Sequence, residues 1–126
     1  MTGERILVVE DNEKNMKLFR DVLSATGYRT LEARTGGEAI ELATANAPDL
    51  VLMDIQMPEV DGVEALRRLR ADERTAAIPV LAVTAQAMQG DRERFLAEGF
   101  DGYLSKPVNV RELIGIVRQH CEGRAG

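Results

Sequence analysis

Residues 50–54 read Leu50-Val51-Leu52-Met53-Asp54, a short apolar run that ends on an aspartate. Two other runs, Ile6–Val9 and Val80–Val83, are similarly short and apolar, and polar side chains follow each of them. Apolar runs of this kind are typical of strands that are covered on both faces of a parallel sheet. The sequence therefore predicts three buried central strands.

Two more polar segments, Tyr28–Ala33 and Gly102–Ser105, have the character of edge strands. Segments with helical spacing alternate with the five strands, and Asn12 is the expected N-cap of the first helix. The predicted helices span about Glu13–Thr26, Gly37–Asn46, Val63–Ala71, Gln89–Glu98 and Val110–Glu122. This alternation requires right-handed crossovers and helices on both faces of a parallel sheet. We expect an α/β, flavodoxin-like, doubly wound fold with five strands in the order 2-1-3-4-5 and five helices.

Composition restricts the classes of function. The 126 residues fit one domain, with a core at about 4–122 and a short disordered tail at 123–126. A net charge of -5 disfavours binding to nucleic acid, and no apolar run approaches the length of a membrane span. The single Cys121 cannot form an internal disulfide, so we expect a protein of the cytoplasm. We also expect a monomer.

Polar side chains follow the predicted strands at their carboxyl ends, where α/β sheets of this type place their sites. They are Glu10 and Asp11 after the first strand, Asp54 after the third, Thr84 after the fourth and Lys106 after the fifth. Two negative charges about 4 Å apart repel by roughly 4 kcal/mol at an effective dielectric constant near 20. Such a cluster needs a cation, and hard carboxylate oxygens favour Mg²⁺ over zinc.

These strand ends also carry a family resemblance. The motifs Val9–Asn12, Met53–Pro58 with Asp61-Gly62, Val83–Ala85 and Ser105–Pro107 resemble those of bacterial two-component response-regulator receiver domains. Within that family, residues 12–19 and 85–91 resemble single-domain cell-division receivers of the DivK kind. The resemblance covers nearly the whole chain and implies the CheY-like form of the flavodoxin-like fold.

The resemblance implies a phosphorylation switch with Asp54 as the phosphoacceptor. Asp11 and Asp54 would bind Mg²⁺, Glu10 would do so directly or through water, and Gln56 would contribute its backbone carbonyl. Many receivers have two aspartates where this chain has Glu10-Asp11, which leaves the contact of Glu10 with the metal open. Lys106, in a cis peptide with Pro107, would neutralise charge on the phosphoryl group.

The resemblance also implies how the signal would leave the site. Thr84 would bind the phosphoryl group and Tyr103 would fill the space it leaves, which would alter the face formed by the fourth helix, fifth strand and fifth helix. A histidine kinase or histidine phosphotransfer protein would be the donor, and a downstream target protein would bind the altered face. The chain would then be a regulatory domain, limited to its own phosphotransfer and autodephosphorylation, rather than an enzyme.

Three alternatives remain at this point. The chain is equally compatible with a receiver excised from a hybrid histidine kinase or a longer regulator. A phosphatase with an aspartyl-phosphate intermediate would want a second acid two residues after the nucleophile, where this chain has Gln56. A flavin carrier on the same fold would need a phosphate-binding loop after the first strand, and Glu10 and Asp11 have the wrong charge for that role.

Overall fold

A computed structural model of the chain describes residues 4–57, 60–85 and 91–125, excluding the side chains of 91, 92 and 122–125. The elements are β1 (Arg5–Val9), α1 (Glu13–Ala25), β2 (Arg29–Ala33), α2 (Gly36–Asn46), β3 (Leu50–Asp54), α3 (Gly62–Ala71), β4 (Val80–Thr84), α4 (Asp91–Glu98), β5 (Gly102–Ser105) and α5 (Val110–Ala125). The strands pair in parallel in the order β2-β1-β3-β4-β5. The predicted fold class and strand order are confirmed.

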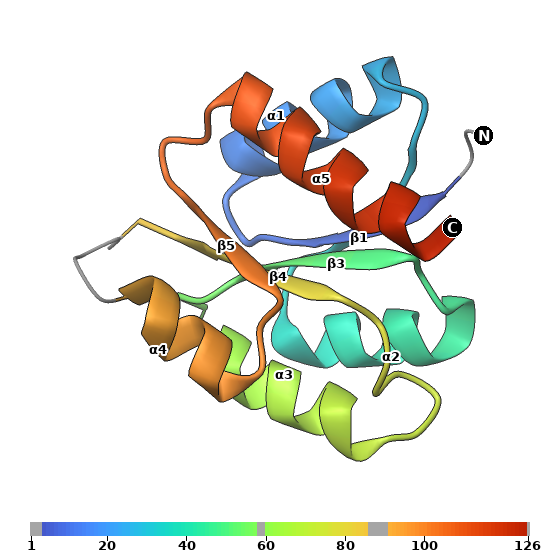
Figure 1. The fold of residues 1–126 in the computed structure, drawn as a ribbon. Coiled ribbons are helices and arrows are strands. Elements are labelled where there is room, and N and C mark those ends of the chain that lie inside the picture. The colour runs from blue at the N-terminus through green and yellow to red at the C-terminus, as the bar shows by residue number, and fades with distance from the viewer. Residues whose placement is uncertain (1–3, 58–59, 86–90, 126) are drawn as a thin grey trace.

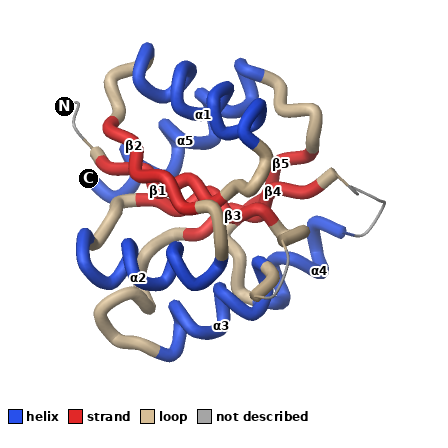
Figure 2. Tube along the Cα trace, turned by 180° about the vertical axis from the view of Figure 1, so that it is seen from behind, coloured by secondary structure: helices blue, strands red, loops and turns tan. Residues whose placement is uncertain are grey.

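Three layers make up the molecule. Helices α1 and α5 cover one face of the sheet, and α2, α3 and α4 cover the other (Figure 1), an arrangement that the opposite view also shows (Figure 2). Strands β2 and β5 lie at the two edges, as their more polar sequences indicated. Within residues 4–57, 60–85 and 91–125, no helix combines the length and the apolarity needed to cross a membrane.

The core consists of two clusters because neighbouring residues of a strand face opposite sides of the sheet. Leu50 and Leu52 pack with α1 and α5, where Phe19 and Val117 are buried. Val51 and Met53 pack on the other face with α2, α3 and α4. Full burial of each large apolar side chain contributes about 1.5–3 kcal/mol. The central strands are therefore a firm support for the residues that follow them.

Side-chain caps determine where three helices begin. Asn12, Thr35 and Asp61 accept hydrogen bonds from the N–H groups of Asn15, Glu38 and Glu64 at 3.1, 3.1 and 2.9 Å. Each such cap stabilises a helix by about 1 kcal/mol. The cap predicted at Asn12 is confirmed, while the other two explain why α2 and α3 begin one residue earlier than predicted.

Other boundaries also differ from prediction. β3 and β4 continue through Asp54 and Thr84, so both residues belong to the rigid ladder. α5 extends to Ala125, and the predicted disordered tail at 123–126 is therefore helical except for Gly126, which lies outside the described residues. α4 is described from Asp91, and its predicted start at Gln89 also lies outside that range.

The side chain of Arg70 joins the beginnings of β4 and β5. Its guanidinium donates hydrogen bonds to the carbonyls of Ala76 and Ile78, and to the carbonyl of Gly99 at 3.0 Å. It also pairs with Asp101 at 2.9 Å, and the same Asp101 oxygen accepts the N–H of Val80 at 2.8 Å. These bonds fix the ends of β4 and β5 that lie opposite the polar strand ends.

Candidate functional site

The polar strand ends predicted from the sequence meet at one edge of the sheet. Val9 is in register with Met53, Asp54 with Val83, and Thr84 with Ser105. Parallel strands in this register end at the same level, so the residues that end or follow them are neighbours. The prediction that these side chains gather at one edge is therefore confirmed. Interatomic distances show it for the three acids and for Lys106, and the strand register shows it for Thr84.

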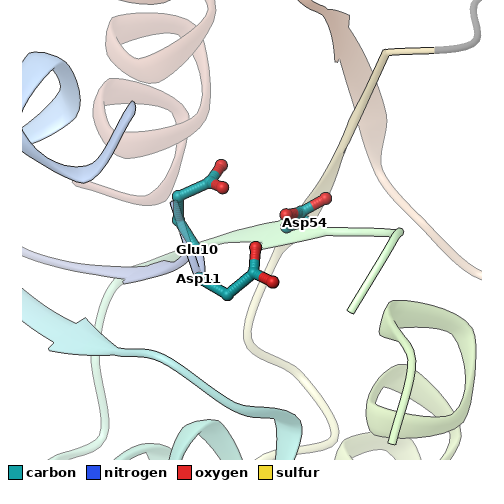
Figure 3. Close-up of side chains that lie close together, drawn as sticks. All are labelled: Glu10, Asp11 and Asp54. Atoms are coloured by element: carbon teal, nitrogen blue, oxygen red, sulfur yellow. The ribbon is translucent and has the colours of Figure 1, made fainter. Parts of the chain in front are cut away.

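Three carboxylates form the centre of the site. Glu10, Asp11 and Asp54 each offer an oxygen, and these oxygens all lie within 4.8 Å of one another. Figure 3 shows the three side chains gathered at the ends of β1 and β3. Glu10 and Asp54 are buried, whereas Asp11 is exposed. The cluster is therefore anchored in the core and open to solvent on one side.

Lys106 supplies the positive charge of the site. Its Nζ lies 2.9 Å from Oε1 of Glu10 and 3.4 Å from Oδ2 of Asp54. The backbone N–H of Lys106 donates to the carbonyl of Thr84 at 2.8 Å, and the Lys106–Pro107 peptide is cis, as the resemblance implied. The lysine thus reaches both buried acids from the position directly after β5.

The pKa values of Asp54 and Lys106 show the charge balance. Burial and the negative charge of Glu10 raise the pKa of Asp54 to about 6, against the opposing effects of the Gln56 N–H and Lys106. Burial lowers the pKa of the Lys106 ammonium, but its bonds and charge attraction to Glu10 and Asp54 exceed that effect and leave the pKa raised. The ammonium of Lys106 is therefore not enough to keep the pKa of Asp54 at its ordinary value.

Hydrogen bonds hold both buried acids in place. Oδ1 of Asp54 accepts the N–H of Gln56 at 3.0 Å, and Oε2 of Glu10 accepts the N–H of Asn12 at 3.1 Å. Oε1 of Glu10 is buried and accepts no well-directed hydrogen bond from the described part of the chain, although the Lys106 ammonium is its ion-pair partner. This under-satisfied oxygen, with the two aspartates beside it, fits a hard divalent cation with oxygen ligands.

Two features of the site were not predicted from the sequence. Glu10 is the nearer partner of Lys106, which the sequence had placed only against a phosphoryl group. Gly62 is the other: a Cβ there would lie 2.5 Å from the carbonyl oxygen of Asp54 and 2.9 Å from Cα of Ile55. A glycine directly after a helix cap is the signal in the sequence, but the close approach becomes visible only in the fold.

Tyr103 and Thr84 are diagonal neighbours across the β4–β5 ladder. Thr84 is buried at the end of β4, and Tyr103 is half-buried in β5, opposite Ala82. The Tyr103 ring lies 6.0 Å from the ring of Phe95 in α4. The tyrosine therefore packs between its strand and α4 rather than standing in solvent.

Comparison with known proteins is decisive at this point, because residues 6–118 match the family model described as response regulator receiver domain. The chain belongs to this family. The receiver is similar to the polar-differentiation response regulator DivK of Brucella ovis, with 50% identity over 115 residues that cover 91% of this chain and 94% of the relative. The DivK protein of Brucella anthropi shows the same identity and coverage.

Solved receiver structures have the same fold. The receiver domain of sensor histidine kinase PA1611 from Pseudomonas aeruginosa, with a magnesium ion in its active site cleft, superposes with a TM-score of 0.87 at 38% identity. That match covers 96% of this chain and 99% of the other. The receiver domain of the Francisella response regulator 1452 gives a TM-score of 0.89 at 29% identity, covering 97% and 99% of the two chains.

Proposed function

We propose that this receiver is a phosphorylation switch that accepts a phosphoryl group on Asp54 with Mg²⁺. The observation that carries the proposal is the surroundings of Asp54. Its carboxylate is buried at the end of a central strand and lies 3.4 Å from the ammonium of Lys106. One of its oxygens lies within 4.8 Å of a carboxylate oxygen of Glu10 and of Asp11. A nucleophile needs such fixed placement and compensation of charge in phosphoryl transfer.

Glu10, Asp11 and Asp54 would hold Mg²⁺ with the backbone carbonyl of Gln56. When bound, Mg²⁺ supplies a positive charge that offsets the repulsion among the carboxylates and the phosphoryl oxygens. Asp54 would form the bond to phosphorus while the bond to the donor histidine nitrogen breaks. Lys106 and the Thr84 hydroxyl would then bind phosphoryl oxygens.

The output of the switch would be altered protein binding. Movement of Thr84 towards the phosphoryl group would change the packing of Tyr103 against Phe95, which lie 6.0 Å apart, and with it the face made of α4, β5 and α5. Turning a mostly inactive population into a mostly active one takes about 5.5 kcal/mol of differential stabilisation. A doubly charged group bound by Lys106 and a divalent ion is a source of energy of that size.

The partners follow from this role. A histidine kinase or histidine phosphotransfer protein would donate the phosphoryl group, and a target protein would bind the altered face. Similarity to DivK supports a role in cell-cycle or cell-division control. The net charge of -5 supports a protein that does not bind nucleic acid, and the single cysteine supports a cytoplasmic one. The protein would act as a monomer and would not bind a membrane.

A second reading places this receiver inside a longer protein. The similar receiver of Pseudomonas aeruginosa is a domain of a sensor histidine kinase, and that observation favours this alternative. The DivK relatives, however, are matched over 94% of their own length, so in those proteins the receiver makes up nearly the whole chain. The reading frame in the genome distinguishes the two.

The test is a titration with Mg²⁺ and beryllofluoride, a phosphoryl mimic, followed by amide NMR. We expect shifts that begin near Asp54 and reach Thr84 and Tyr103. The Asp54→Asn variant should show none of them. The matched control is Asp61→Asn, which changes an exposed cap of α3 and should respond like the wild type. Shifts confined to the Asp54 loop, without Thr84 or Tyr103, would refute the switch.

A further inference from the structure

A groove runs between β5 and α5, beside the face that the proposed function uses for output. Its volume is about 430 Å³, and its described lining consists of Asp101–Ser105 from β5 and Glu112, Ile116, Gln119 and His120 from α5. The four α5 residues lie on one side of that helix, at spacings of three and four. In Figure 1 β5 lies between α5 above it and α4 below it.

One wall of the groove is an unpaired strand edge. Within the described residues β5 pairs only with β4, so its other edge faces away from the sheet. The N–H of Asp101 donates to the carbonyl of Val80 at 2.8 Å, and within the strand the backbone N–H and C=O groups of Asp101 and Tyr103 are directed towards β4, before the N–H of Lys106 bonds to Thr84. The backbone N–H and C=O groups of Gly102 and Leu104 are therefore directed to the open edge.

Gly102 keeps this edge accessible. A Cβ there would lie 3.1 Å from Cδ2 of Leu81, 3.5 Å from Cδ1 of Ile116 and 3.8 Å from Cε1 of His120. A side chain at this position would fill the gap between the strand and α5. Without one, the part of the groove between Gly102 and α5 stays open for a side chain of a bound segment.

The charges of the lining have one sign. The described lining residues include two carboxylates, on Asp101 and Glu112, and no lysine or arginine. Asp101 is already paired with Arg70, whereas exposed Glu112 forms no ion pair within the described part of the chain. Nδ1 of His120 lies 2.9 Å from the carbonyl oxygen of Ile116, which can only accept, so Nδ1 donates to it. Glu112 thus offers its negative charge to a positively charged ligand.

We propose that the groove between β5 and α5 binds an extended, basic segment of the target protein, which adds a strand to the free edge of β5. Four strand residues span about 13 Å, so the segment would be about four to six residues long. Its backbone would pair with Gly102 and Leu104, an apolar side chain would contact Ile116, and a lysine or arginine would reach Glu112.

This inference rests on the proposed function, because it names the chemistry of the target that the switch would select. Thr84 is in register with Ser105, and Tyr103 is a residue of the same strand. Any movement of Thr84 and Tyr103 is therefore transmitted to the strand that forms the groove wall. Binding of the segment should depend on the state of Asp54.

The experiment is a selection of peptides followed by mapping. A phage-displayed library of random seven-residue peptides is panned in parallel on the wild-type chain, on Glu112→Lys, and on Glu41→Lys as control. Glu41 is an exposed acid of α2, on the opposite face of the sheet. We expect the wild type and the control to enrich lysine or arginine among alternating β-branched residues, and Glu112→Lys to lose that preference at least tenfold.

Mapping then tests the binding mode. The most enriched peptide should shift the amides of Gly102 and Leu104 most strongly, bind several-fold tighter or weaker with beryllofluoride, and lose binding when alternate peptide amides are methylated. Gly102→Val should abolish binding, and its amide shifts should stay confined to β5, the neighbouring part of β4 and the side of α5 that faces Gly102. Acidic or helical peptides, shifts on another face, equal binding of the methylated peptide, or a second copy of this chain on the edge would each overturn the proposal.

A separate readout distinguishes failure of the groove from failure of the switch. The same wild-type and Glu112→Lys samples are labelled with acetyl phosphate. If both samples are labelled equally but no peptide was found to bind at β5, the groove proposal alone is overturned. Peptide binding at β5 without labelling of either sample supports the groove and overturns the proposed function.

Discussion

Replacing Asp54 with asparagine should make the folded protein more stable at pH 7.5 when no Mg²⁺ is present. Asp54 is 2% exposed, and Glu10 lies beside it in the same cluster. The fold therefore holds a charged carboxylate in surroundings that oppose its charge. The N–H of Gln56 donates to Oδ1 of Asp54 at 3.0 Å. Asparagine has nearly the same shape as aspartate and can still accept this hydrogen bond, but it carries no charge.

The size of the effect follows from the pKa. Folding raises the pKa of Asp54 from 3.8 to about 6. A shift of about two units corresponds to up to about 3 kcal/mol of destabilisation once the group is ionised in both states. Between pH 3.8 and 6 the folded chain keeps a proton that the unfolded chain has lost, so stability falls as the pH rises through this window. The Asp54→Asn substitution removes this loss, so the gain should be about 2–3 kcal/mol at pH 7.5 and close to zero below pH 4.

Urea unfolding of both proteins in EDTA, followed by circular dichroism from pH 4 to 8, measures the difference. The free energy of unfolding of the wild type should fall relative to that of the variant as the pH rises from 3.8 to about 6. Saturating Mg²⁺ should close the gap, because a ligand that binds only the folded state stabilises it. A variant that is less stable at pH 7.5, or a gap that does not change with pH, would refute the electrostatic reasoning.

Three further outcomes test the site and the fold that supports it. Glu10→Gln should weaken Mg²⁺ binding about tenfold or more in calorimetric titration, because it removes one of three clustered charges; an unchanged affinity would show that Glu10 faces only Lys106. Gly62→Ala should destabilise the fold by about 1–3 kcal/mol in urea, since its Cβ would lie 2.5 Å from the Asp54 carbonyl. Gly115→Ala is the matched control, with nothing within 4 Å, and should stabilise by about 0.5–1 kcal/mol; similar losses in both would contradict the steric argument. Arg70→Met should cost about 2–4 kcal/mol in the same assay through the bonds it makes to Gly99 and Asp101, and a loss below about 0.5 kcal/mol would contradict the bracing role of that side chain.

Most of the fold was predictable because local and global signals agree in this chain. The apolar runs at residues 6–9, 50–53 and 80–83 identify central strands, and the alternation with helices then restricts the topology. The same rule places Glu10, Asp54 and Lys106 at one edge without coordinates. Predicted helix starts were least accurate where a cap such as Thr35 or Asp61 was overlooked.

What the sequence did not provide were relations between side chains from distant segments. The 2.9 Å pair between Lys106 and Glu10 depends on how far each side chain reaches across the sheet edge. Which apolar side chain of α4 is buried depends on how that helix is rotated against the sheet: Phe95 is buried and the neighbouring Leu96 is exposed. Such details arise from packing, which periodicity alone does not determine.

The central claim is that Asp54 accepts a phosphoryl group with the help of a divalent ion bound by its acidic neighbours. Intact-mass measurement after incubation with acetyl phosphate tests it most directly, with Mg²⁺ or with EDTA, on the wild type and on Asp54→Asn. We predict that the wild type gains the mass of one phosphoryl group only with Mg²⁺ and that the variant gains none. Undiminished labelling of the variant, or of the wild type in EDTA, would contradict the account.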